Sequence, residues 1–143
     1  MRTNEFGQAI GDALPEFTPG RLPAIERIEG RYTVIERVSK EKHGADLYQV
    51  YGPDSPAAMW TFLFKGPARN EEEWDHLLDD LMTAQGRFYY AIVDKDSGKA
   101  LGTFSLMRID QANRVIEVGA VTYSPALQKT RMATEAQYLL ARY

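Results

Sequence analysis

The sequence predicts an α+β (mixed α/β) domain, in which helices pack on a largely antiparallel sheet. Three apolar runs at 87–94, 100–109 and 115–123 are separated by short polar turns, as expected for an antiparallel meander. A strongly amphipathic helix at 71–86 precedes these strands, and a second helix at 130–143 follows them. Together these observations place helices on a sheet built from neighbouring strands.

The first 30 residues are predicted to form an irregular arm that precedes the domain at 31–143. They contain three prolines and four glycines, which remove backbone donors and loosen the chain. The arm is either a disordered tail or a segment that packs across the domain, and we favour the packed arm. Five apolar residues are its candidate anchors: Phe6, Leu14, Phe17, Leu22 and Ile25.

The segment 31–40 alternates and is rich in β-branched residues, which predicts a strand. The segment 41–52 then predicts a short helix, with Ser39 as its N-cap. For the helix at 71–86, Asn70 is the expected cap, Glu73 completes a capping box, and Gly86 ends the helix.

The overall composition is that of a folded domain, with 44% hydrophobic and 26% charged residues among 143. A net charge of −3 with both signs interspersed argues against a nucleic-acid binder. The absence of cysteine excludes disulfides, thiolate catalysis and cysteine metal sites. The N-terminus has no signal-peptide pattern, and no apolar run approaches the roughly 20 residues that span a bilayer. We therefore expect a cytoplasmic protein without a membrane segment.

Metal binding is not expected. The only histidines, His43 and His76, lack partners at metal-ligand spacing, so we interpret both as surface or boundary residues. The acidic turn at 94–98 lacks the glycine and the carboxylate that an EF-hand loop requires, so it predicts a hairpin turn.

An aromatic-rich connection at 57–70 carries Trp60, Phe62 and Phe64. These side chains could line a pocket or belong to the core, and we favour the core.

Glu117 lies within an otherwise apolar strand. Partial burial would raise the pKa of its carboxyl and make it a better proton acceptor near neutral pH. Equally, it could face water or pair with Arg108 or Arg114 on the neighbouring strand.

The stretch SPALQKTRMATEA, at 124–136, joins the last strand to the last helix. Such a connection directs free N–H groups of the helix at one point, where they could bind phosphate with help from Lys129 and Arg131. The simpler interpretation is an ordinary connection capped by Thr130, and the spacing alone favours it.

The order of these elements resembles that of the GNAT superfamily of acetyl-CoA-dependent N-acetyltransferases, and most of all its ribosomal-protein N-terminal acetyltransferase branch. That family carries a loop of the form Q/R-x-x-G-x-G/A between its fourth strand and the following helix. Gln128 and Ala133 match this form, whereas Arg131 stands at the first glycine. The segments 133–137 and 30–51 also resemble the family, as does the hairpin AIVDKDSGKALGTFSL.

The resemblance implies an enzyme that transfers an acetyl group from acetyl-CoA to an amine, with no metal. Glu117 would be the general base, Trp60 and Phe62 would contact the acceptor, and Val121, Thr122 and Tyr123 would hold the pantetheine arm. The pyrophosphate would bind backbone amides at Gln128, Lys129, Thr130, Arg131, Met132 and Ala133, provided that the backbone at Arg131 is helical.

The family continues beyond this helix, so the chain is expected to represent its N-terminal two-thirds. An open edge at the fourth strand would favour pairing with a partner chain, including a homodimer. Two rival interpretations are a GNAT-like module that binds ligands without turnover and a purely structural dimerisation domain.

Overall fold

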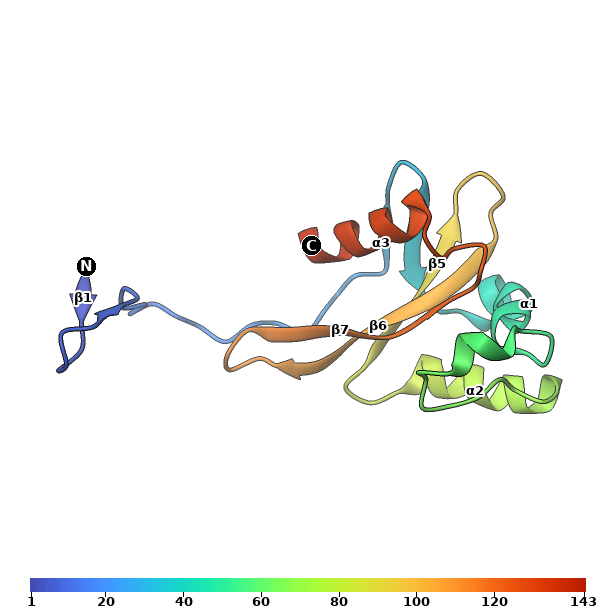
Figure 1. Ribbon diagram of the computed structural model, residues 1–143, viewed down its shortest axis with the longest axis horizontal. Coiled ribbons are helices and arrows are strands. Elements are labelled where there is room, and N and C mark those ends of the chain that lie inside the picture. Colours follow the sequence, from blue (N-terminus) through green and yellow to red (C-terminus); the bar gives the residue numbers. More distant parts are fainter.

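The computed structural model describes all residues from 1 to 143. Its body is a five-stranded antiparallel sheet with neighbouring strands in the order β3 (Arg27–Glu29), β4 (Thr33–Arg37), β5 (Phe88–Asp94), β6 (Ala100–Asp110) and β7 (Val115–Tyr123). Helices α1 (Lys40–Tyr51) and α2 (Glu71–Thr83) cover one face of the sheet, and α3 (Arg131–Arg142) covers the other (Figure 1). The predicted α+β class and the meander of β5, β6 and β7 are confirmed.

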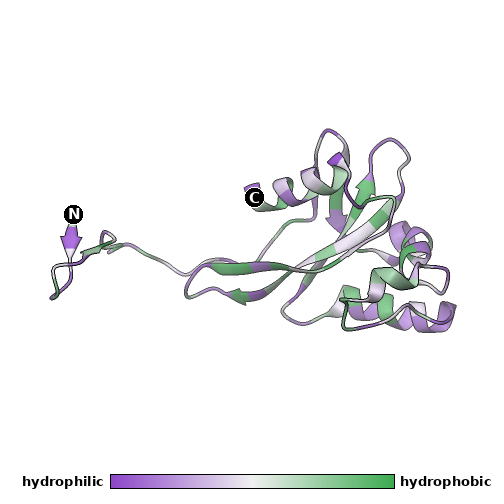
Figure 2. Ribbon diagram, viewed as in Figure 1, coloured by the Kyte–Doolittle hydropathy of each residue, from purple (hydrophilic) through white to green (hydrophobic).

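Two hydrophobic cores lie on opposite faces of the sheet. The core beneath α1 and α2 contains Trp74 and Leu78, and the core beneath α3 contains Tyr90 and Phe104. Adjacent residues of a strand therefore enter different cores, which explains why these strands are apolar along their whole length. In Figure 2 the strands are largely hydrophobic, whereas the turns at their ends are largely hydrophilic.

The predicted N-caps of α1 and α2 are confirmed, but the predicted capping box and the predicted end of α2 are wrong. Ser39 caps α1, and the Asn70 side chain accepts a hydrogen bond from the Glu73 N–H at 2.9 Å, as expected. The Glu73 carboxylate, however, accepts from the Arg69 N–H at 2.8 Å, one residue before the position that a capping box requires. The helix also ends at Thr83, before Gly86, which has a φ of 68° and lies in the following turn.

The N-terminal arm extends away from the domain at its start (Figure 1), whereas further along Gly20 exchanges hydrogen bonds with Gln111, and Thr18 accepts from Arg114, in the turn between β6 and β7. Strands β1 (Arg2–Thr3) and β2 (Ala9–Ile10) form a small separate hairpin near its tip. The expected packing of its apolar residues is partly confirmed: Ile25 is buried and the half-exposed Phe17 ring lies 4.6 Å from the Arg114 guanidinium, whereas Phe6, Leu14 and Leu22 are exposed. Strand β3 at the end of the arm was not predicted, because it is only three residues long and two of them are charged.

Helix α3 is fastened to the turn between β3 and β4 by one carboxylate. Glu135 accepts hydrogen bonds from the backbone N–H groups of Arg31, Tyr32 and Thr33 at 2.8, 2.7 and 2.8 Å. A Cβ at Gly30 would lie 2.6 Å from Cδ of Glu135, so the close approach of the turn requires glycine there. This contact fixes α3 against the sheet.

Replacing Glu135 with glutamine should destabilise the fold in a pH-dependent way. Partial burial acts to raise the pKa of Glu135, but the three N–H donors outweigh it and hold the pKa below its ordinary value of 4.5. The carboxylate therefore contributes stability above that value, and the contribution disappears as the pH falls through the lower folded pKa. At pH 7, Glu135→Gln should lower the free energy of unfolding by about 2 kcal/mol, because a neutral amide is a weaker acceptor for three donors.

Urea denaturation of the wild type and the variant between pH 7 and pH 3 checks this expectation. The stability difference should shrink below pH 4.5. Glu16→Gln, which changes an exposed arm residue without hydrogen bonds, is the control for net charge. A difference that is equally small for both variants at pH 7 would contradict the role given to Glu135.

Candidate functional site

The turn between β7 and α3 is rigid although it contains no glycine. Leu127 is fully buried, and the N–H groups of Leu127 and Gln128 both donate to the Ser124 carbonyl. The Thr130 hydroxyl donates to the Leu127 carbonyl at 2.7 Å and accepts from the Ala133 N–H at 3.2 Å. The expected Thr130 cap is therefore present, and it is tied back to the buried centre of the turn.

Arg131 has the helical backbone conformation that phosphate binding without a glycine at this position requires. Arg131 is the first residue of α3 and does not have a positive φ, so glycine is not needed there. The left-handed conformation instead falls on Lys129, with a φ of 59°. The Arg131 guanidinium lies 4.1 Å from the centre of the Tyr32 ring, so its side chain is stacked against the β3–β4 turn.

Four consecutive backbone donors are free at the start of α3. The N–H groups of Lys129, Thr130, Arg131 and Met132 make no hydrogen bond within the chain. The predicted neighbours Gln128 and Ala133 differ, since their N–H groups are already bonded. Free N–H groups and the dipole of a 12-residue helix together favour a bound anion, so the arrangement can hold a phosphate.

Strand β7 is the last strand of the sheet, so its outer edge is unpaired. Its pairing with β6 shifts by one residue, because Thr103 faces Thr122 while Ser105 faces Gly119. The extra residue produces a bulge, and Ala120 within it has a φ of 48°. Val121 and Tyr123 then face the core beneath α3, whereas Thr122 is buried on the α1–α2 side.

A pocket of about 190 Å³ opens on the α1–α2 side of this bulge and is lined by Ala120 and Thr122. Its floor includes Tyr51, whose hydroxyl lies 2.6 Å from Oγ1 of Thr103, and burial raises the pKa of Tyr51. A second hollow, of about 210 Å³, is lined by Val121, Thr122, Tyr123 and Gln128. Both hollows share Thr122 and Leu63, so they adjoin at the end of β7.

Of the predicted acceptor residues, the structure brings only Trp60 to this pocket. Its ring lies 5.8 Å from that of Tyr51, and Nε1 donates to Oγ of Ser55 at 2.9 Å. Phe62 is 94% exposed and does not line the pocket, whereas the exposed Phe64 does. The core interpretation of Phe62 and Phe64 is therefore wrong, because the irregular backbone after Trp60 turns both outward.

Glu117 lies on the same face of the sheet as the pocket, but outside its lining. The side chain is 43% exposed and forms an ion pair with Nη1 of Arg108 at 3.0 Å. Of the alternatives left open by the sequence, the structure shows the pairing with Arg108, on a side chain that also faces water. Glu117 lies three positions before Ala120, about 10 Å along a strand, so its carboxylate is beyond direct hydrogen-bond reach of a group bound at the bulge.

Sequence reasoning missed Tyr51, Lys65 and Arg87 as lining residues. Tyr51 lies on the buried face of α1 with Leu47 and Val50, and an apolar helix face does not distinguish a core residue from a pocket floor. Lys65 lies in a connection, where no periodicity indicates direction, and Arg87 is the charged first residue of the run 87–94 and lies just before β5 begins at Phe88.

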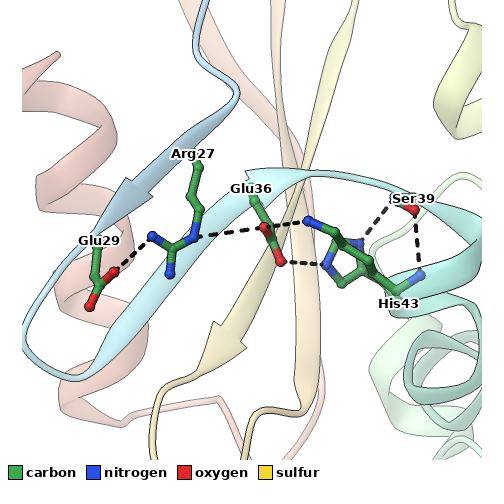
Figure 3. A network of polar contacts seen from close by, with 6 residues as sticks. Arg27, Glu29, Glu36, Ser39 and His43 are labelled. Carbon is green, nitrogen blue, oxygen red and sulfur yellow. Dashed lines mark hydrogen bonds and ion pairs between the residues drawn. The ribbon is translucent and has the colours of Figure 1, made fainter.

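His43 belongs to a structural network at the start of α1 (Figure 3). It is only 3% exposed, so its interpretation as a surface or boundary residue is wrong. The Ser39 N–H donates to Nδ1 at 3.1 Å, and Nε2 donates to Oε1 of Glu36 at 3.0 Å. Burial acts to raise the pKa of Glu36, but hydrogen bonds from His43 and Lys42 lower it overall. Neither of the two hollows at the end of β7 is lined by this network, which fixes the junction of β4 and α1.

No group of three or more His, Asp or Glu side chains in the structure could hold a metal ion. None of the helices is both long and apolar enough to cross a membrane.

Comparisons with known proteins agree with this geometry. A family model described as an acetyltransferase (GNAT) domain matches residues 34–143. A search of curated proteins finds no match.

Solved structures share the fold. A GCN5-related N-acetyltransferase from Brucella melitensis superposes with a TM-score of 0.85 and 35% identity, covering 91% of this chain and 59% of that chain. A probable GNAT-family acetyltransferase from Chromobacterium violaceum gives 0.81 and 29%, covering 94% and 67%. A spermidine N-acetyltransferase from Vibrio cholerae, solved with CoA and spermine, gives 0.60 and 12% over 80% and 64%, which shows the fold alone.

The chain thus spans 59% of the length of the Brucella protein. The family model matches most of the sequence, and the structural neighbours share the sheet, its helices and their order. The chain belongs to the GNAT acetyltransferase family.

Proposed function

We propose that the protein transfers an acetyl group from acetyl-CoA to a primary amine. The observation that carries this proposal is the run of four free N–H groups, from Lys129 to Met132, beside the unpaired edge of β7. In this proposal those donors bind the pyrophosphate of acetyl-CoA, and the edge at Val121, Thr122 and Tyr123 binds its pantetheine arm. The acetyl group then reaches the bulge, where the pocket containing Trp60 admits the amine.

In the proposed reaction the amine nitrogen attacks the thioester carbonyl. The new C–N bond forms, the C–S bond breaks, and CoA leaves as a thiolate that takes a proton from solvent. Glu117 accepts the amine proton through a chain of water molecules and releases it to solvent, which fits its place on the pocket's face of the sheet but outside the pocket lining. The ribosomal-protein branch indicates a protein N-terminus as one acceptor, and a small amine is the other. The cytoplasmic location and the homodimer remain predictions.

The rival function is a ligand-binding module without turnover. It shares the free N–H groups but gives Glu117 no chemical role, so substitution of Glu117 separates the two.

Arg131→Pro tests the phosphate site through the backbone. Position 131 is the first residue of α3, where proline is tolerated, and Thr130 before it is extended, with φ −104° and ψ 162°. The variant loses one N–H donor, so acetyl-CoA should bind about 10- to 100-fold more weakly. Arg131→Ala loses the side chain but keeps the donor, and it should weaken binding by less than about threefold.

Calorimetric titration with acetyl-CoA measures both variants, with thermal unfolding as the check that each is folded. Equal affinities for Arg131→Pro and wild type would contradict phosphate binding by these amides. An equal loss of acetyl-CoA affinity in both variants would show that the effect comes from the Arg131 side chain and not from its backbone N–H.

Glu117→Gln should lower the acetylation rate by about 100-fold or more, with acetyl-CoA affinity unchanged, if Glu117 is the base. Since the substitution also breaks the ion pair with Arg108, Arg108→Asn is the matched control, and asparagine tolerates the positive φ of 48° there. A steady-state assay with an amine panel measures both. An unchanged rate in Glu117→Gln, or an equal loss in Arg108→Asn, would exclude a specific role as the base.

A further inference from the structure

The charged residues that line the pocket beside the bulge are all positive. Eight of its 12 lining residues are hydrophobic, and its only charged members are Lys65 and Arg87. Both are exposed at the rim, and neither forms an ion pair. Glu117, the carboxylate on the same face, lies outside the lining and is already paired with Arg108.

The interior of the pocket suits one ring-sized apolar group. Its volume is about 190 Å³, and an apolar cavity of about 150 Å³ accommodates benzene. Tyr51, Leu81 and Tyr89 are less than 9% exposed and form its floor, while Trp60 and Leu77 form its walls. Aromatic and aliphatic walls of this kind stabilise a ligand by removing its apolar surface from water.

The two ends of the pocket differ. Thr122 is buried beside the bulge of β7, where the proposed acetyl group would lie. Lys65 and Arg87 are exposed to solvent. A ligand that fills the pocket therefore contacts buried Thr122 of β7 as well as two exposed, unpaired cations.

We infer that the acceptor is a primary amine with a ring-sized apolar body and an anionic group, such as a carboxylate, which pairs with Arg87 and Lys65. This inference rests on the proposed function and names the substrate class of the same site. A polyamine is disfavoured, because its several positive charges would meet two cations and no carboxylate in the lining.

The test compares matched amines by calorimetry on the CoA-saturated full chain. The probes are 4-(aminomethyl)benzoate, benzylamine, which has the same body without the carboxylate, and spermidine. The benzoate should bind about five- to tenfold more tightly than benzylamine, because a carboxylate gains charge-assisted hydrogen bonds at the rim. Spermidine should bind most weakly.

Substitutions test whether the tighter binding of the benzoate than of benzylamine depends on the cations of the pocket. Arg87→Gln should reduce it to about twofold or less, whereas Arg87→Lys should retain part of it because the charge remains. Lys99→Gln removes an exposed cation of the β5–β6 turn, outside the pocket, and should leave the preference unchanged.

Equal binding of the benzoate and benzylamine, tighter binding of spermidine, or no binding of any probe would overturn the inference. The same would follow if Arg87→Gln kept the full preference. A separate titration with acetyl-CoA distinguishes this failure from failure of the proposed function, because only the latter abolishes nucleotide binding. If CoA does not bind, the amine titrations are made on the chain alone and judged by the same outcomes.

Discussion

The position of α3 depends on the Glu135 carboxylate and the three N–H groups that it binds at 31–33. A helix dipole acts on a ligand only within about its first turn, so the place where α3 begins determines where an anion can bind. Glu135 lies in the second turn, close enough to the N-terminus to fix that place. Gly30 makes the contact sterically feasible, since a side chain there would overlap Glu135 and Leu139.

The turn before α3 is constrained from its other end by Leu127. Its full burial and the hydrogen bonds to Ser124 and Thr130 leave the backbone few alternatives. Rigidity that other sequences obtain with glycine-rich loops is here obtained by packing and capping. The strain is confined to Lys129, and the donors at 129–132 remain free because nothing in the chain competes for them. The bulge at Ala120 then brings the two hollows together at Thr122.

Much of the fold could be predicted because local chemistry specifies it. Apolar runs with short polar turns produce the meander, and Ser39, Asn70 and Thr130 cap helices as their side chains allow. Strand β3 could not be predicted, since it exists only through pairing with β4. Three of the five predicted anchors of the arm, Phe6, Leu14 and Leu22, are exposed, because apolar character alone does not show which surface is available for packing.

The candidate site also combines features that the local sequence predicts with features that depend on how distant segments pair. The sequence indicated the turn after β7 and the carboxylate at Glu117, but the bulge at Ala120 and the ion pair to Arg108 depend on strand register. Trp60 lines the pocket beside the bulge and Phe62 does not, a difference that could not be predicted because an irregular segment carries no periodicity that indicates direction.

The most direct test of phosphate binding by free backbone donors is an amide-resolved nuclear magnetic resonance titration of the full chain with CoA. The amides of Lys129, Thr130, Arg131 and Met132 should shift most, and Gln128 and Ala133 should shift less. Saturable binding that leaves those four amides unmoved, or no binding at all by the folded chain, would contradict the account.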